Sequence, residues 1–299
     1  MELINEWIKN PYGGAEFKKR ILGIDAANPY LEIAECSLSL GINELYELSF
    51  NKLSKAEKLI LELITLRNSG KTNEMFNNIE EALNLVRKKE SRDLVLEGRL
   101  RMELGLIKVQ SNSKDNPHDD FDWALKRLAS VSTNSRLHGL SIINKAAFHE
   151  HSNEHFMALH LYGEIPLEGE FPAEIVGFSR IGAARIMSGI GNHKEACRHL
   201  YNAYQVFSKS NNIELAWHSG FEFIKLGAQF AELNAERMSE QIINAKPMEV
   251  GDEKQVAKIN PLDLKEIARD LKENNEIYFK VDDSIKEFIN QILEHSELL

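Results

Sequence analysis

The 299-residue chain has few of the residues that interrupt or cross-link a fold, with two cysteines, seven prolines and 17 glycines. Cys36 and Cys197 are far apart in the sequence, which argues against a disulfide framework. No apolar run approaches the roughly 18 residues that a membrane-spanning helix needs. The N-terminus also lacks the basic start and apolar segment of a signal peptide. We therefore expect a cytoplasmic protein that does not contact a membrane.

Patterns typical of strands and of catalytic loops are also scarce. Only residues 276–281 suggest a strand, and a loop between helices fits them equally well. The sequence contains no Gly-rich phosphate-binding loop, no nucleophile elbow and no zinc-type cysteine pair. Long stretches with helical periodicity dominate instead. The sequence thus predicts a mainly helical protein that is not an enzyme and holds no cofactor.

The composition, with 43% hydrophobic and 27% charged residues, is typical of a soluble globular protein. A formal charge of -10 opposes attraction to nucleic-acid backbones and anionic lipids. The short basic clusters at residues 18–20 and 87–89 are typical of a solvated helix face or of a helix C-terminus. Nucleic acid is therefore not expected to be a direct partner.

Small residues recur in phase along the chain, and this is the clearest positive signal. Ala184 and Ala196 are twelve residues apart, and Ala196 is followed at helical spacing by Leu200 and Ala203. Such a pattern predicts two amphipathic helices that pack closely against each other.

The same phase continues towards the N-terminus. Ala146 and Ala158 are again twelve residues apart, and Ala124 precedes Ala158 by 34 residues. Gly105 takes the close-packing position of a helix predicted from residue 93 to 110, followed by a polar loop over residues 111–120. Weaker units are predicted on both sides, one around Leu63 and Met75 and one over residues 214–230, with 233–243 as its partner.

This pattern resembles tetratricopeptide repeats, whose two-helix unit has a period of about 34 residues. The resemblance implies an all-α fold, a right-handed helical array over residues 54–245. It leaves an N-terminal helical segment at 1–53 and a C-terminal helical pair at 246–299. A non-repeating helical bundle is the alternative, because Ala and Leu at such spacings occur on any amphipathic helix.

The first helix of each pair lines the concave face of tetratricopeptide arrays. The resemblance thus places eleven residues there: Arg67, Asn68, Arg99, Met102, Ile143, Glu150, Phe178, Ile181, Arg185, Trp217 and Lys225. This mixture of apolar, amide and charged groups suits an extended peptide. It predicts a non-catalytic scaffold that binds a protein or a short peptide, and the sequence leaves a homodimer open. Packing between repeats is the alternative role of Phe178 and Trp217.

Residues 28–45 resemble the last two helices of the helix-turn-helix domains in phage-repressor-like regulators. Leu31, Ala34 and Leu38 are predicted to face inward, Gly41 to end the helix and Asn43 to cap the next one. Only 27 residues precede this segment, and residues 11–14 interrupt the place of an earlier helix. The layout resembles bacterial peptide-pheromone-responsive regulators. A peptide-sensing transcriptional or signalling regulator with a truncated helix-turn-helix is therefore the alternative function.

Two further helices are predicted near the C-terminus. Asn260 and Pro261 begin the first, whose apolar stripe includes Ile267 and Leu271, and the second has its stripe around Ile289. We expect this pair to cap the open end of the array or to dock into it.

Three histidines, His149, His151 and His155, form the densest group of potential metal ligands. The i, i+4 spacing of His151 and His155 could place two imidazoles on one ion if the helix were continuous. Ser152 and Asn153 instead indicate a turn between them. We therefore expect exposed turn histidines and no metal.

Overall fold

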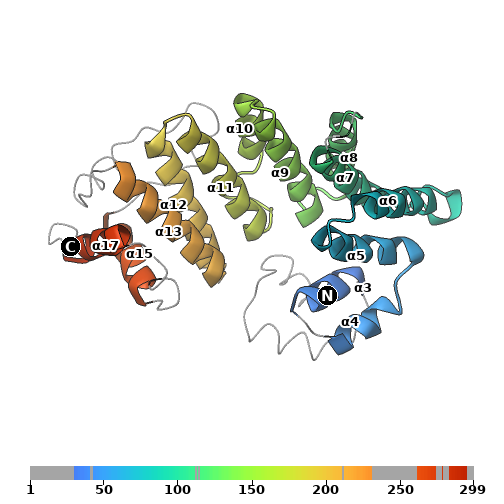
Figure 1. Ribbon diagram of the computed structural model, residues 1–299, viewed down its shortest axis with the longest axis horizontal. Helices are drawn as coiled ribbons and strands as arrows, with labels where there is room; N and C mark the ends of the chain where they lie inside the picture. The colour runs from blue at the N-terminus through green and yellow to red at the C-terminus, as the bar shows by residue number, and fades with distance from the viewer. Residues whose placement is uncertain are drawn as a thin grey trace. The chain divides into compact units, whose positions relative to one another are not determined.

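The computed structural model describes residues 30–40, 43–111, 113, 115–210, 212–230, 261–273, 278 and 283–294. In these residues every regular element is a helix and no strand occurs, which confirms the predicted all-helical fold (Figure 1). None of the helices in these ranges is long and apolar enough to cross a membrane. The chain divides into two compact units, unit 1 with residues 1–148 and unit 2 with residues 149–299. This division falls inside the predicted array, whose boundaries at residues 54 and 245 stay a prediction.

Unit 1 contains the helices α3 (Tyr30–Leu40), α4 (Asn43–Phe50), α5 (Lys55–Asn68), α6 (Thr72–Val86), the short 3-10 helix η1 (Lys89–Ser91), α7 (Leu94–Gln110) and α8 (His118–Val131). The helix α9 (Arg136–His151) reaches the boundary between the units. Unit 2 contains α10 (His155–Gly163), α11 (Ala173–Gly189), α12 (His193–Lys209), α13 (Ile213–Phe230), α15 (Pro261–Glu273) and α17 (Asp283–Glu294). The predicted helix boundaries near residues 93, 110, 214, 230 and 261 agree with these bounds.

Three helix pairs are joined by the same tight turn. Gly70, Asn153 and Gly191 each adopt a positive φ, of 68°, 61° and 82°. In each turn the residue after this position donates its N–H to a carbonyl five residues earlier, at 2.8 to 3.1 Å, while the positive-φ residue donates to a carbonyl three residues earlier. This is the Schellman arrangement, which glycine and asparagine favour. In two of these pairs, α5 with α6 and α11 with α12, the second helix packs back along the first.

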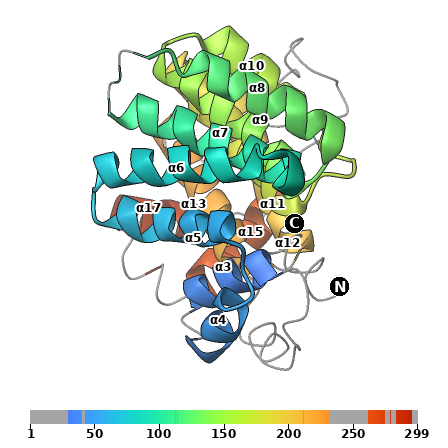
Figure 2. The same ribbon diagram turned by 90° about the vertical axis from the view of Figure 1, so that its right-hand side faces the viewer.

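In unit 1, α5, α6, α7 and α8 pack in chain order, and α5 to α7 lie side by side (Figure 2). The core between α5, α6 and α7 includes Leu63, Met75 and Ile79, as the weak repeat signal predicted. Gly105 of α7 faces α8, where a Cβ would lie 2.9 Å from the ring of Phe121. The absence of a side chain at Gly105 thus lets the aromatic ring pack directly on the backbone of α7.

The N-terminal helices differ from the prediction at Leu38, which is exposed, and at Asn43, which begins α4 instead of capping it. Leu31 and Ala34 of α3 are buried as expected, but Leu38 is 37% exposed. The buried stripe continues through Ser37, whose hydroxyl donates to the carbonyl of Ile33 at 2.6 Å. Because this hydrogen bond satisfies the hydroxyl, a polar residue can replace the leucine inside. Asn43 is the first residue of α4.

In unit 2, α11, α12 and α13 lie side by side (Figure 1). Ala158, Ala184 and Ala196 are all buried, as the repeat phase predicted. Two glycines of α11 bring aromatic rings against its backbone. A Cβ at Gly182 would overlap the ring of Tyr162 from α10, and one at Gly177 would overlap the ring of Phe207 from α12.

The C-terminal helices pack against α13, which agrees with the expected docking of this pair. Their buried residues share one core cluster with α12 and α13. It includes Tyr204, Phe223, Ile224, Ile267, Leu271, Ile285 and Ile289. The hydroxyl of Tyr204 also donates to Oδ2 of Asp270 at 2.9 Å. The predicted strand or loop at 276–281 apart from residue 278, the predicted helix at 233–243, residues 1–29 and Gly41 lie outside the described residues.

Candidate ligand-binding surface

The structure separates the predicted ligand-contact residues of unit 1 into buried and exposed groups. Met102 is 3% exposed, so it belongs to the interior of unit 1 and not to a surface. Arg99 pairs with Glu35 of α3, and both side chains are largely buried. Breaking such a buried pair costs roughly 3–5 kcal/mol, so Arg99 joins helices and does not await a ligand. Arg67 is more exposed and pairs with Glu103 of α7. Asn68 ends α5.

In unit 2, the structure brings together two of the predicted residues. The Nε and Nη2 atoms of Arg185 on α11 donate to the two carboxylate oxygens of Glu150 at 2.5 and 2.6 Å. The hydroxyl of Tyr162 on α10 lies 3.5 Å from the same carboxylate. This hydrogen bonding raises the pKa of Arg185, while burial and the charge of Glu150 raise the pKa of Tyr162 to about 12. Arg185 therefore stays protonated and the Tyr162 hydroxyl stays neutral at neutral pH.

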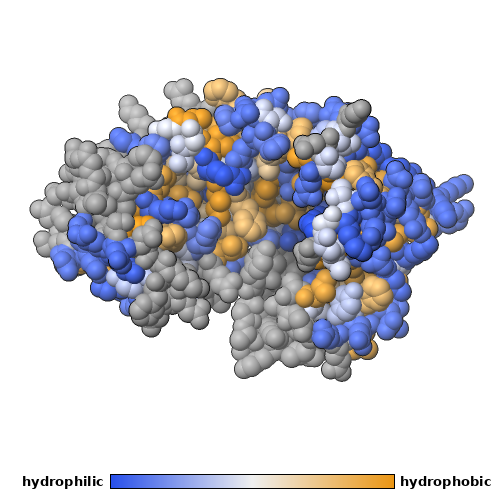
Figure 3. Space-filling view, in the orientation of Figure 1, coloured by the Kyte–Doolittle hydropathy of each residue, from blue (hydrophilic) through white to orange (hydrophobic). Residues whose placement is uncertain are grey.

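Three side chains share one face of α11 at helical spacing. Phe178 and Ile181 are half-buried at the edge of the core formed with α12 and α13, and the Phe178 ring lies 6.0 Å from that of Phe207. Arg185, one turn further, is 58% exposed. Hydrophobic and hydrophilic side chains both reach the surface over α11 and α12 (Figure 3). One face of α11 thus carries two partly exposed apolar side chains, Phe178 and Ile181, followed by the cation Arg185.

The helix α13 repeats this order. Trp217 and Phe221 are half-buried, and Phe221 packs against the same core cluster. The Nζ atom of Lys225 lies 6.0 Å above the Phe221 ring and 3.7 Å from the carboxylate of Glu222. An aromatic residue, a second apolar residue and a cation therefore follow one another on α13 as on α11. Phe221 and Tyr162 were not among the predicted contact residues, because their roles depend on packing between helices.

Buried polar side chains of unit 2 offer little for catalysis at neutral pH. The guanidinium of Arg180 is buried and donates to the backbone carbonyls of Tyr162 and Ile165 at the end of α10. Burial, with the charge of Arg180, lowers the pKa of His199 to about 3 and so keeps its imidazole neutral. Burial also raises the pKa of the Cys197 thiol to about 12, so that almost no nucleophilic thiolate forms.

The histidine prediction needs one correction. His149 is buried, and its Nδ1 atom lies 2.5 Å from Oε2 of Glu154. The pair closes the turn after α9, and the helix carries His149 on its inner face. His151 is exposed and His155 half-buried. Within the described ranges, no group of three or more histidine, cysteine or acidic side chains is placed to hold a metal ion.

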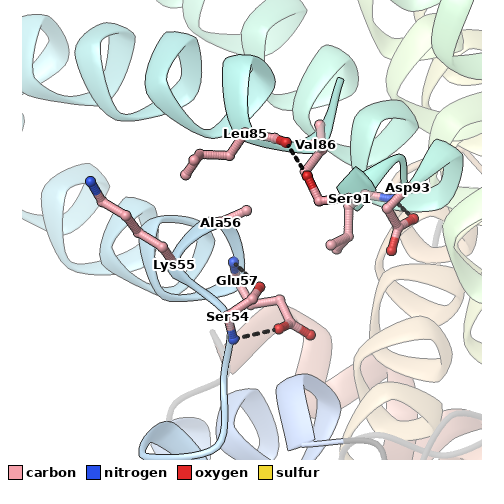
Figure 4. Close-up of a pocket in the computed structure, with 9 residues that line it drawn as sticks. Ser54, Lys55, Ala56, Glu57, Leu85, Val86, Ser91 and Asp93 are labelled. Carbon is pink, nitrogen blue, oxygen red and sulfur yellow. Dashed lines mark hydrogen bonds between the residues drawn. The ribbon is translucent and has the colours of Figure 1, made fainter. Parts of the chain in front are cut away.

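Unit 1 also contains a cavity of 440 Å³ where α5 and α7 begin and α6 ends (Figure 4). Its carboxylates and hydroxyls are engaged by other groups of the protein. Ser54 and Glu57 form a reciprocal capping box, Ser91 donates to the carbonyl of Leu85 at 2.7 Å, and Asp93 accepts from two backbone amides of α7. The carboxylates and hydroxyls here therefore serve the helix ends. The remaining lining consists of apolar residues such as Val86 and of Lys55, which pairs with Glu81.

The paired helices and their shared turns agree with the sequence pattern, while membership of the tetratricopeptide repeats stays a prediction. No protein-family model, no curated protein and no solved structure matches this chain.

Proposed function

We propose that this protein is a non-catalytic scaffold that binds a protein or a short peptide, with α11 and α13 as its contact surface. The observation that carries the proposal is the repeated order of side chains on these two helices: Phe178, Ile181 and Arg185 on α11, and Trp217, Phe221 and Lys225 on α13. Both helices contribute to one core cluster, so that cluster fixes the positions of both faces.

The chemistry of these faces suits an extended segment with apolar and acidic side chains. Half-buried aromatic edges supply apolar contact area, and exposed arginine and lysine can bind carboxylates. Arg185 is 58% exposed, but it already holds Glu150, which is 19% exposed, through two hydrogen bonds. A ligand carboxylate must therefore compete with Glu150 for the Arg185 guanidinium.

A peptide library displayed on phage and selected on the intact protein would test the proposal. We expect enriched sequences to combine apolar and acidic residues. Replacing Arg185 and Trp217 together by alanine should weaken their binding by about tenfold or more, because arginine and tryptophan often dominate interface energies. Glu150→Gln should strengthen binding, since it frees the Arg185 guanidinium from its internal partner.

Lys194→Ala is the matched control, because it removes an exposed cation from α12 of the same unit. It should leave binding nearly unchanged, and the melting temperature of each variant should be recorded alongside. Selected peptides that bind the folded Arg185 and Trp217 double variant as tightly as the original protein would refute this contact surface.

The peptide-sensing regulator remains the second candidate function. It is favoured by the packing of α3 against α5 and by the ion pair of Glu35 with Arg99, which join α3 to the later helices of unit 1. Such contacts could carry a change from the repeats to α3 and α4. Under this hypothesis, a selected peptide should alter hydrogen exchange in α3, and unchanged exchange at saturation would argue against it.

A further inference from the structure

Two guanidinium groups lie over one indole ring on the surface of unit 1. Trp123 is half-buried on α8, and the Cζ atoms of Arg101 from α7 and Arg127 from α8 lie 5.6 and 5.3 Å from its ring centroid. Stacking on an aromatic ring holds each guanidinium plane while its edge stays available for hydrogen bonds.

The carboxylates near this cluster are already engaged. Asp120 is buried, and it accepts from Nη1 of Arg101 at 2.5 Å and from Nζ of Lys108 at 2.6 Å. Asp122 pairs with Lys145 at 2.7 Å. This hydrogen bond lowers the pKa of Asp122, and the charges of Lys145 and Lys126 act in the same direction. The acidic groups therefore leave a local excess of positive charge on a protein whose formal charge is -10.

Arg127 has no acidic neighbour at the spacings where a helix would provide one. The residues three and four positions away on α8 are Trp123, Ala124, Ser130 and Val131. Across the portion of the chain that the structure describes, no ion pair includes Arg127. Its guanidinium thus differs from those of Arg67, Arg99 and Arg185, each of which holds a carboxylate of the protein.

The Nε atoms of Arg101 and Arg127 are both shielded from solvent, and neither has a hydrogen-bond acceptor among the described residues. A shielded N–H without an acceptor is costly, and such groups are rare in native proteins. Nη1 of Arg101 already donates to Asp120, so Nη2 of Arg101 and the Nη atoms of Arg127, which are not among the shielded atoms, are the donors that a carboxylate can reach.

We propose that the cluster formed by Arg101, Trp123 and Arg127 is a binding site for the carboxylates of an acidic peptide segment. Each guanidinium would donate to a carboxylate from Nη atoms, because Nε is shielded from solvent, and the indole would hold both guanidiniums in place. The site shares no residue with the proposed surface on α11 and α13. It therefore stands independently of the function proposed above.

The cluster suits carboxylates better than nucleic acid. Single-stranded nucleic acid commonly binds by stacking its bases on open aromatic faces, whereas guanidiniums lie over the ring of Trp123. The negative charge of the whole protein also repels a long polyanion more strongly than a short acidic peptide.

Titration of the intact protein with tetraglutamate, followed by nuclear magnetic resonance, tests the site. The indole N–H resonance of Trp123, identified by its loss in Trp123→Phe, should shift saturably. Arg127→Gln should weaken binding by about tenfold or more, because it removes a charge-assisted hydrogen bond. Arg127→Lys should also weaken binding, since lysine keeps the charge but lacks the planar edge.

Lys126→Gln provides the matched control, because it removes the neighbouring exposed cation from the same helix. It should weaken binding by less than about threefold, as expected for a surface charge outside the site. Tetraglutamine should produce no shift. The proposal is overturned if tetraglutamate gives no saturable shift in the folded protein, or if Lys126→Gln weakens binding as much as Arg127→Gln. Tighter binding of an oligothymidylate than of tetraglutamate would overturn the choice of a peptide.

Discussion

The close approach of Tyr162 to Gly182 gives a prediction that can be checked against a second glycine of the same helix. A Cβ at Gly182 would overlap the ring of Tyr162, whereas a Cβ at Gly189 would meet nothing within 4 Å. Both glycines lie in α11, so alanine improves the helix propensity at both positions, by up to about 1 kcal/mol.

The expected loss of stability in Gly182→Ala depends on how little the Tyr162 ring can move. It is 2% exposed, and its hydroxyl lies against the carboxylate of Glu150. Forcing extra volume into such a packed site costs roughly 1–3 kcal/mol. We therefore expect Gly182→Ala to destabilise the protein by about 1–2 kcal/mol after the gain in propensity, and Gly189→Ala to be neutral or slightly stabilising.

Urea denaturation followed by far-ultraviolet circular dichroism would measure the difference. With a slope of about 2–3 kcal/mol per molar urea, Gly182→Ala should lower the midpoint by roughly 0.5 M. In a Tyr162→Leu background the smaller side chain leaves room for the methyl group. Most of the cost of Gly182→Ala should then disappear, as a double-mutant cycle would show. Equal midpoints for Gly182→Ala and Gly189→Ala would refute the close packing of α10 on α11.

Three further measurements test other parts of the structure. The free energy of unfolding should fall as the pH drops from about 6.5 towards 3, by up to about 1.4 kcal/mol per pH unit. In this range the unfolded chain protonates His199, whereas the folded protein does not, because burial lowers the pKa of His199 to about 3. His199→Gln should flatten this slope in urea titrations at several pH values, and an unchanged slope would contradict the burial of a neutral imidazole. Ala196→Leu should cost roughly 1–3 kcal/mol, since Ala196 is fully buried, and an unchanged denaturation midpoint would count against the repeat phase. Ser54→Ala should lower the free energy of unfolding by about 0.5–2 kcal/mol through loss of the capping box of α5, whereas the exposed Ser130 on α8 provides a neutral control.

Local patterns predicted the helices and their close contacts well. The bounds of α7, α13 and α15 agree with capping and periodicity, and the alanines of the repeat phase are buried as expected. These features depend on residues within one helix or in adjacent ones, where spacing alone determines which side chains face inward. The prediction that Leu38 faces inward was wrong, because a hydrogen-bonded serine, Ser37, can take the place of an apolar residue on the inner face of α3.

The candidate site depends on contacts between separate helices, and the spacing of residues in the sequence does not predict these contacts. A register can place Arg99, Arg185 and Met102 on one face of their helices, but it does not show which carboxylate lies opposite or how deep a side chain is buried. Glu35 is 64 residues from Arg99 and Glu150 is 35 residues from Arg185. Both partnerships depend on how separate helices pack, so only the structure distinguishes the joining role of Arg99 from the accessible Arg185.

The shared turns carry opposite charges at one position in the two units. Arg67 and Glu150 both stand three residues before the positive-φ residue of their turn, so they occupy the same turn position with opposite charges. Each pairs with the opposite charge on the first helix of the next predicted pair, Arg67 with Glu103 and Glu150 with Arg185. The helix packing is therefore supported in the same way in both units, while the group available to a ligand at this position is a cation in unit 1 and an anion in unit 2. Under the proposed function, a segment bound near Arg67 would present acidic groups there, and one bound to unit 2 would present its acidic group on the first helix of the next pair, at Arg185.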